Sequence, residues 1–590
     1  MRKLVHIFIL LFTVLTAQAQ YYIRGEVTDE KHQPLQNVKI YMQSNHLLYY
    51  SGVTGGFGIT TPLLYDSLTF NLPGYETKSV KVKSDMYQVI TLKVLSGNTN
   101  IQKQKLLSVT KDFSNQEDRR IFVSDETYSS LSENEFVHAD KFPSNSFSVR
   151  VDKASYSNIR RFVNQNSVVP PDAVRLEEML NYFNFNYKEP SPGKVFTIES
   201  QISPCPWNAS HQLLFLNLSA RKLNLDKVPP GNFVFLIDIS GSMDMPNRLP
   251  LLKASFQLLV KNLRAIDTVS IVIYGGSVGV WLQPTSGAEK QKIIKAIEEL
   301  SPGGSTPGEA AIRTAYRIAK STFLKNGNNR IILATDGDFN VGQTTEKELE
   351  EMIAKERQSG IYLTCLGVGM GNYKDSKIEA LAKKGDGNFA YLDDIREGEK
   401  VLVKEFTQTL YTVANDVYMN MQFNPLMVKE YRLIGYDNKK NIMADTSVEL
   451  EGGEVGSANG ITSIFEIIPS ASMNNTDNAK NSVAALTINY RTPDDTAKKR
   501  IRYDCPQNLK LFKDLPNELR FASAITMFGL IIRQSKFINN ATFDTVLPIA
   551  VESLNPADYL QNEFISLVEK AKKIYAVKKK KRKLGDKIFN

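Results

Sequence analysis

A short polar run follows one of the most apolar segments of this chain. Asp238-Ile-Ser240-Gly-Ser242 comes directly after Phe233-Val-Phe-Leu-Ile237. Such an apolar run is typical of a buried strand. A strand that ends in an Asp-x-Ser-x-Ser loop can hold a divalent cation, because hydroxyl and carboxylate oxygens are ligands for hard cations. Taken alone, the run is equally compatible with a simple turn at a strand end.

Two later residues favour the cation site over the simple turn. Thr306 lies in the loop Ser301-Pro-Gly-Gly-Ser-Thr-Pro307 ahead of a helical pattern, and Asp336 ends a second apolar run, Ile331-Ile-Leu-Ala-Thr-Asp336. Three hydroxyls would supply neutral oxygens, and two carboxylates would supply negative charge. A small, hydroxyl-rich site favours Mg²⁺ or Mn²⁺ over Ca²⁺.

In type and order these five residues match the metal-ion-dependent adhesion site of von Willebrand factor type A (VWA) domains. The resemblance implies that Ser240, Ser242 and Thr306 contact the ion, whereas Asp238 and Asp336 act mainly through bridging waters. It also implies that an Asp or Glu carboxylate of a protein partner fills the open position. The chain would then be a metal-bridged binding protein of the adhesion or scaffold kind, with no catalytic residues.

The elements around these residues alternate between strands and helices. The patterns predict strands at 233–238, 268–274, 330–335 and 361–368, and helices at 249–263, 288–300, 308–324, 345–358 and 376–383. Apolar strands that alternate with helices predict a doubly wound parallel sheet covered on both faces. Ligands of such sheets bind at the carboxyl ends of the strands. All five candidate residues fall in loops that follow strands or precede helices.

At 590 residues the chain should hold several domains. Strand-like segments at 195–228 and 414–506 flank the VWA segment at 229–413, and we expect one β-sandwich with the VWA domain inserted in it. The other predicted parts are a signal peptide (1–19), a small β-sandwich (20–95), a linker (96–132), an N-terminal region of the VWA protein (133–194), a helical C-terminal region (507–575) and a basic tail (576–590).

Several motifs resemble bacterial VWA proteins of the YfbK type from about residue 133 to 572. They include Glu133-Asn-Glu-Phe136, Ser203-Pro-Cys-Pro-Trp207 and Thr335-Asp-Gly-Asp-Phe-Asn340. Outside that range, Gly25-Glu-Val-Thr-Asp29 resembles a carboxypeptidase-regulatory-like module. Thr54-Gly-Gly departs from the Thr-Asp-x-x-Gly turn that is more usual there. Such modules are spacers or docking units.

The N-terminus has the features of a cleavable secretory signal. A short basic start and an apolar run too short to span a bilayer lead to Ala17-Gln-Ala19, which supplies the small residues that a signal peptidase reads. A buried or anchoring helix is the alternative. No later stretch is long and apolar enough to span a membrane. We therefore expect an exported protein, periplasmic or associated with the cell surface.

The net charge of +9 is concentrated at the chain ends. Residues 572–583 hold eight basic side chains and no acidic one, and Arg2 and Lys3 add two more, so the remainder is close to neutral. This distribution gives no basic face for nucleic acid. The tail could contact an anionic surface weakly, although most such runs are simply solvated.

The three cysteines do not predict a clear disulfide framework. Cys365 lies in an apolar run, which predicts that its thiol is buried in the core and inert. Cys205 and Cys505 flank the VWA segment, and they could form a disulfide in an oxidising compartment or remain free. If the insertion is real, both belong to one β-sandwich.

A metal-dependent hydrolase that uses the same cation is the rival function. Catalysis needs a positioned general base, and the candidates in the VWA loops are Asp238, Asp244, Glu309, Asp336 and Asp338. The VWA segment contains no histidine. No Walker-type loop or His-Glu-x-x-His occurs in the chain.

Overall fold

The computed structural model divides the chain into two compact units, residues 1–109 and 110–590, and each is described by itself. The structure describes residues 21–44, 48–52, 54–61, 63–72, 74–84, 86–94, 126–224, 228–275, 277–304, 308–337, 346–370, 373–405, 411–436, 452–474, 482–493, 495–538 and 541–588. The predicted signal segment, most of the predicted linker, Thr306 and Asp338 lie outside these residues.

The N-terminal unit is built from two small β-sheets. Its strands are β1 (Tyr21–Thr28), β2 (Lys39–Met42), β3 (Leu48–Tyr50), β4 (Gly56–Thr61), β5 (Tyr65–Asn71), β6 (Lys78–Lys83) and β7 (Tyr87–Thr91). One sheet has the order β4-β1-β7 and the other β3-β2-β5-β6. Alternate residues such as Ile40, Leu68 and Phe70 form the core between the sheets. The two-sheet arrangement agrees with the predicted small β-sandwich.

The second unit contains a larger β-sandwich. One sheet has the order β10-β11-β21-β19-β8, formed by β10 (Phe196–Cys205), β11 (Asn208–Ala220), β21 (Gly460–Pro469), β19 (Val428–Leu433) and β8 (Val137–His138). The other has the order β20-β18-β22-β23, with β9 also paired to β18; these strands are β20 (Gly453–Gly456), β18 (Thr412–Phe423), β22 (Ser482–Thr492), β23 (Asp495–Pro506) and β9 (Ser144–Ser148).

The α/β segment of the second unit is inserted between strands of this sandwich. β11 precedes the segment and β21 follows it, yet the two pair directly, with Leu216 opposite Ser463. Leu214 and Leu216 of one sheet and Leu486 and Ile488 of the other belong to the same buried cluster. The predicted insertion agrees with this pairing.

The inserted segment is the expected α/β fold with a mixed sheet. Its strand order is β14-β13-β12-β15-β16-β17, formed by β12 (Gly231–Asp238), β13 (Thr268–Gly275), β14 (Ser277–Ser286), β15 (Asn328–Thr335), β16 (Ile361–Val368) and β17 (Asp386–Leu392). β14 runs antiparallel to β13, and the other neighbours are parallel. The prediction of a wholly parallel sheet was therefore wrong at one edge.

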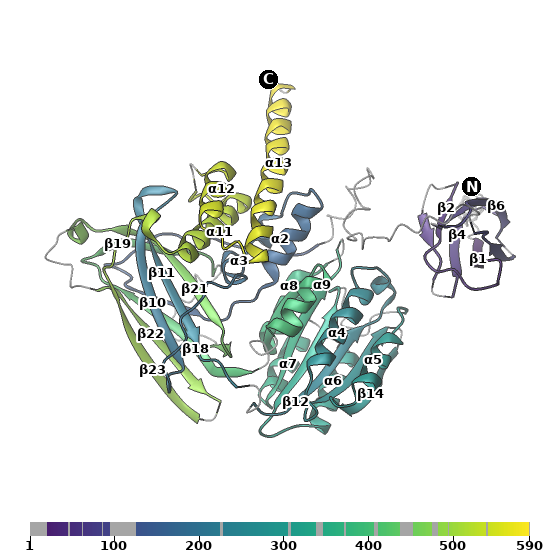
Figure 1. Cartoon of the computed structure of the whole chain (residues 1–590), viewed down its shortest axis with the longest axis horizontal. Coiled ribbons are helices and arrows are strands. Elements are labelled where there is room, and N and C mark those ends of the chain that lie inside the picture. Colours follow the sequence, from purple (N-terminus) through teal and green to yellow (C-terminus); the bar gives the residue numbers. More distant parts are fainter. Residues whose placement is uncertain are drawn as a thin grey trace, which may run out of the picture. The chain divides into compact units, whose positions relative to one another are not determined.

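Helices cover both faces of this sheet (Figure 1). They are α4 (Leu249–Asn262), α5 (Lys290–Glu298), α6 (Gly308–Ser321), α7 (Glu346–Arg357), α8 (Asp375–Lys384) and α9 (Ile395–Glu399). Phe233, Phe235 and Ile237 of β12 share a buried cluster with α4 and α5. Val234 and Leu236 share another with α6, α7 and α8. β12 is buried along its whole length, which places its carboxyl end at the middle of the domain.

A helical layer packs on the outer face of the first sandwich sheet (Figure 1). It contains α2 (Ala154–Asn164), α3 (Leu176–Asn181), α11 (Asn517–Arg533), α12 (Phe543–Glu552) and α13 (Tyr559–Ile588). Phe215 of β11 and Phe521, Phe528 and Phe564 of the helices belong to one buried cluster. The expected C-terminal helical region is thus a core-packing layer. Within the described part of the chain, no helix is both long and apolar enough to span a bilayer.

All three cysteines are buried and free. Cys205 belongs to the cluster shared with the helices, whereas Cys505 belongs to the sandwich core. They therefore lie in one sandwich, as expected, but on opposite sides of a sheet and without a bond. Burial raises the pKa of all three thiols, that of Cys505 to about 12, so they are protonated and unreactive at neutral pH.

Candidate metal centre

The Asp-x-Ser-x-Ser loop lies at the carboxyl end of the central strand β12. Asp238 is the last residue of that strand and is completely buried, and Ser240 is also buried. The backbone N–H of Ile239 donates to the carbonyl of Tyr274 at 2.9 Å, which fixes the exit of the loop against β13. Because β13 and β15 run parallel to β12, the loops after all three strands meet at this edge of the sheet.

Both oxygens of the Asp238 carboxylate accept hydrogen bonds. The backbone N–H of Ser240 donates to Oδ1 at 2.9 Å, and the hydroxyl of Thr335 donates to Oδ2 at 3.0 Å. Burial raises the pKa of Asp238 to about 6, and the nearby negative charge of Asp336 acts in the same direction. A buried carboxylate that is costly to ionise gains when a cation is brought beside it.

Two hydroxyl oxygens converge next to this carboxylate. Ser240 Oγ and Ser242 Oγ are 3.1 Å apart. Ser242 is exposed, whereas Ser240 is 3% exposed. A pair of hydroxyls with one member facing solvent can present oxygens to an ion that a second molecule can also reach.

Asp336 follows directly on β15 and is almost completely buried. Its Oδ2 accepts a hydrogen bond from Arg248 Nη1 at 2.6 Å. Sequence reasoning missed Arg248, which precedes α4 in Met245-Pro-Asn-Arg248-Leu. A single basic residue before a helix has no recognisable signature, and its partner Asp336 lies 88 residues further along the chain.

The described residues just before Thr306 lie against the Ser240 loop. The backbone N–H of Gly303 donates to the Ile239 carbonyl at 2.6 Å, and that of Gly241 donates to the Gly304 carbonyl at 3.2 Å. A Cβ at Gly275 would lie 2.7 Å from the Gly303 oxygen, so the close approach of these loops requires glycine there. Thr306 itself lies outside the described residues, and its role as a ligand stays a prediction.

The chemistry of these donors fits a hard cation. The structure brings together the carboxylates of Asp238 and Asp336 with the hydroxyls of Ser240 and Ser242, and these groups offer only oxygen. Among the described residues, no group of three or more His, Cys, Asp or Glu side chains gathers as a metal centre. A site of the zinc type built from nitrogen and sulfur is therefore not found in this part of the chain.

The acidic residues considered for a hydrolase lie in different surroundings. Asp244 is exposed, and Glu309 pairs with Arg313 at 2.8 Å on the surface of α6. Asp238 and Asp336 already accept the hydrogen bonds described above, and Asp338 lies outside the described residues.

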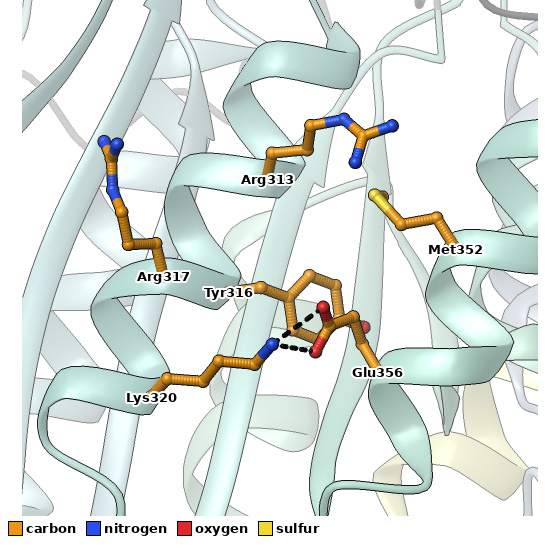
Figure 2. A pocket seen from close by; sticks show the side chains of 6 residues that line it. All are labelled: Arg313, Tyr316, Arg317, Lys320, Met352 and Glu356. Atoms are coloured by element: carbon orange, nitrogen blue, oxygen red, sulfur yellow. Dashed lines mark hydrogen bonds and ion pairs between the residues drawn. The ribbon is translucent and has the colours of Figure 1, made fainter.

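A hollow between α6 and α7 offers no better catalytic site. It is lined by Arg313, Tyr316, Arg317, Lys320, Met352 and Glu356 (Figure 2). Lys320 and Glu356 form an ion pair across it at 2.7 Å. The lining groups lie on the middle and last turns of these two helices, away from the loops at the carboxyl edge of the sheet.

Comparison with known proteins follows this division of the chain. The family described as von Willebrand factor type A domain matches residues 232–407, the family described as uncharacterized protein YfbK, C-terminal, matches 408–574, and one described as von Willebrand factor matches 122–215. The uncharacterized protein YfbK of Escherichia coli is 36% identical over 469 residues, which are 75% of this chain and 80% of that protein.

More distant likenesses are confined to parts of the chain. Inter-alpha-trypsin inhibitor heavy chain H2 of Mesocricetus auratus is 28% identical over 209 residues, which are 34% of this chain but only 21% of that protein. A solved structure, a von Willebrand factor type A protein from Catenulispora acidiphila, is 15% identical and covers 63% of this chain and 88% of its own, with a TM-score of 0.37.

Proposed function

The chain belongs to the YfbK family of VWA-domain proteins, and from that premise we propose that it is a metal-dependent protein-binding module. VWA domains often bind proteins and are usually not catalytic. The proposed site lies at the carboxyl end of β12, where a divalent cation would link this chain to an acidic side chain of a partner. Mg²⁺ or Mn²⁺ is the proposed ion, with Ca²⁺ less suitable.

The observation that carries the proposal is the pair of hydroxyls beside a buried carboxylate. Ser240 Oγ and Ser242 Oγ lie 3.1 Å apart, and the Asp238 carboxylate is fixed between the Ser240 amide and the Thr335 hydroxyl. Ser240, Ser242 and Thr306 would bind the ion directly. Asp238 and Asp336 would orient bound waters.

A cation held chiefly by neutral hydroxyls keeps a strong attraction for an anion. The side of the site next to exposed Ser242 faces solvent, so a carboxylate of a partner protein can approach there. When bound, the cation supplies the positive charge that this carboxylate coordinates. The residues of this chain contribute the orientation of the site, and three of them, Asp238, Ser240 and Asp336, are buried.

The location and the tail are part of the same proposal. Ala17-Gln-Ala19 would end a signal peptide. Export would bring the protein to the periplasm or the cell surface, where it would act in adhesion or as a scaffold. The basic residues of 572–583 would add at most a weak attraction to an anionic surface. The partner is a protein that offers Asp or Glu, and nucleic acid is not proposed.

Two measurements test this function. Asp238→Ala and Thr306→Ala should abolish Mg²⁺ binding in calorimetry, whereas Asp244→Asn, which alters an exposed acid in the adjacent loop, should leave it unchanged. A pull-down from the native cell envelope should capture a partner with Mg²⁺ and release it with chelator. Unchanged Mg²⁺ binding in both site variants, or a partner that binds equally well in excess EDTA, would contradict the proposal.

A further inference from the structure

We propose that Arg248 is a fixed positive charge built into this site, which weakens the binding of metal alone and makes metal and an acidic ligand bind cooperatively. This inference rests on the proposed function and adds to it how the site is regulated. It starts from the contacts of one side chain, which joins three loops at the carboxyl edge of the sheet.

The guanidinium of Arg248 contacts each of these loops. Nη1 donates to the Ser242 carbonyl at 2.6 Å and to Asp336 Oδ2 at 2.6 Å, and Nη2 donates to the Met370 carbonyl at 2.9 Å. The side chain is 8% exposed. A guanidinium stays charged at any physiological pH, so a permanent positive charge lies in a poorly hydrated place against a residue of the site.

The loop after β16 is shaped to hold this side chain. Gly369 has φ +89°, and a Cβ there would lie 2.6 Å from Arg248 Nε. Its carbonyl accepts a hydrogen bond from the Tyr391 hydroxyl at 2.5 Å. Since no other residue fits at Gly369 without moving the guanidinium, the position of Arg248 is built into the fold and is not a chance surface contact.

The charges of the described groups give the consequence. Asp238 and Asp336 are two negative charges, Arg248 is one positive charge, and the serine hydroxyls are neutral. A divalent cation would therefore leave the site with one excess positive charge, which the carboxylate of a ligand would cancel. Without Arg248, the charge of the metal alone would cancel the two negative charges of the site. The ligand carboxylate would then bring an excess negative charge.

Arg248 therefore weakens the binding of the metal alone and strengthens the binding of the metal together with a carboxylate. Charges separated by a few ångströms in a poorly hydrated place interact strongly. Coupling of two ligands is reciprocal, so acidic ligand and metal should each raise the affinity of the other. A protein of this kind would hold metal weakly until its acidic partner arrives.

The test is a Mn²⁺ titration of the full chain by calorimetry. Arg248→Met should bind Mn²⁺ at least about tenfold more tightly than the wild type, because one positive charge is removed. Arg248→Lys keeps the charge but not the three planar contacts, and its Mn²⁺ affinity should stay close to that of the wild type. Arg264→Met is the matched control, since it removes another Arg–Asp pair, with Asp267 at 2.7 Å, before β13 at the other end of the sheet.

A structural clamp would give a different pattern. If Arg248 only holds the loops together, both Arg248→Met and Arg248→Lys should bind Mn²⁺ less tightly than the wild type. Equal or weaker Mn²⁺ binding by Arg248→Met thus overturns the inference and leaves the proposed function intact. Absence of Mn²⁺ binding by the wild type and all variants would instead overturn the proposed function.

A second measurement does not depend on the folding of a variant. In the wild type, acetate should increase the Mn²⁺ affinity relative to chloride at the same ionic strength, since acetate presents a carboxylate. The same increase should be smaller in Arg248→Met. A wild-type Mn²⁺ affinity that does not respond to acetate would contradict the cooperativity.

Discussion

At the residue scale, the site depends on contacts between side chains that are distant in the sequence. Four of the five candidate ligands (Asp238, Ser240, Ser242 and Asp336) come together at one edge of the sheet, and they were predictable because each follows a strongly apolar strand. Thr335 and Arg248 were not predictable as site residues. Thr335 reaches Asp238 across 97 residues of sequence, and no local pattern marks a hydroxyl that supports a carboxylate.

Thr335→Val tests the support of Asp238. The substitution keeps the shape but removes the hydroxyl that donates to Asp238 Oδ2 at 3.0 Å and accepts from the Gly337 N–H at 3.0 Å. Mg²⁺ affinity should fall by about 10- to 100-fold, the range found when groups that orient metal ligands are removed. Thr285→Val is the control, because Thr285 is also buried but bonds only locally, to the Gln283 carbonyl. An equal effect of the two variants would contradict a role for Thr335 at the site.

Gly369→Ala tests the fit of the loop around Arg248. At φ +89° any side chain is strained, and here the new Cβ would also meet Arg248 Nε. Unfolding by urea should show a loss of about 2–4 kcal/mol, of which about 1–2 is the left-handed backbone. Gly193→Ala is the control, because Gly193 has φ +84° with nothing within 4 Å of the new Cβ. Equal losses in both variants would show that Arg248 can move at no cost.

At the element scale, long apolar runs predicted β12, β15 and β16 with ends within two residues of those observed. Two described strands of the same sheet, β14 and β17, were missed. β14 is an edge strand with mostly partial burial, and β17 begins with Asp386-Gly-Asn, so neither has the uninterrupted apolar run of a central strand. The helix α2 was also difficult to predict, because its sequence is polar although the helix is buried. Its polar residues Ser155, Ser157 and Asn158 are fully buried, because the helix lies between β17 and α13.

Arg160 of α2 is the centre of this junction. Its guanidinium bonds Asp393 at 2.5 Å, Glu397 at 2.7 Å and Glu563 at 2.8 Å, and only 3% of the side chain is exposed. It thereby connects α2 to the end of β17, to α9 and to α13. Such a cluster holds the α/β domain against the helical layer.

Arg160→Met should be strongly destabilising. It removes the cation that the three carboxylates share and leaves, among the described residues, only Lys400, 3.8 Å from Glu397, and Arg396, 3.5 Å from Glu563. Removing one partner of a buried ion pair in this way costs about 3–5 kcal/mol. Urea unfolding should show this loss. Arg313→Met removes an exposed pair on α6, with Glu309 at 2.8 Å, and should cost less than about 1 kcal/mol. Similar small losses in both variants would mean that the carboxylates around Arg160 are solvated or protonated in the fold.

At the scale of the whole molecule, the order of domains was largely predictable, whereas their junctions were not. The alternation of strands and helices at 229–413 between strand-rich flanks predicted an insertion, and β11 pairs with β21 across it. The junction itself depends on single residues with no pattern of their own. Arg330 of β15 is 1% exposed and lies 3.5 Å from Glu454 of β20 in the sandwich.

Glu454 makes this junction sensitive to pH. Burial raises its pKa to about 7; Arg330 and Arg150 oppose that rise, and Asp386 adds to it. Below the unfolded pKa of about 4.5 the carboxyl is protonated in both the folded and the unfolded chain. Between about 4.5 and 7 the unfolded chain ionises first, so the contribution of Glu454 to stability is full at low pH and is lost as the pH rises through 7.

Glu454→Gln should remove this dependence, because the amide keeps a polar oxygen toward Arg330 but cannot ionise. In urea unfolding at a series of pH values from 5 to 8, the stability of the wild type relative to Glu454→Gln should fall by about 2 kcal/mol as the pH rises. Glu552→Gln, which alters a largely exposed carboxylate on α12, should leave the pH profile of the wild type unchanged. If the wild type gains stability relative to Glu454→Gln as the pH rises, Glu454 is an ionised partner of Arg330 throughout, and the junction is an ordinary buried ion pair that acid, not base, would weaken.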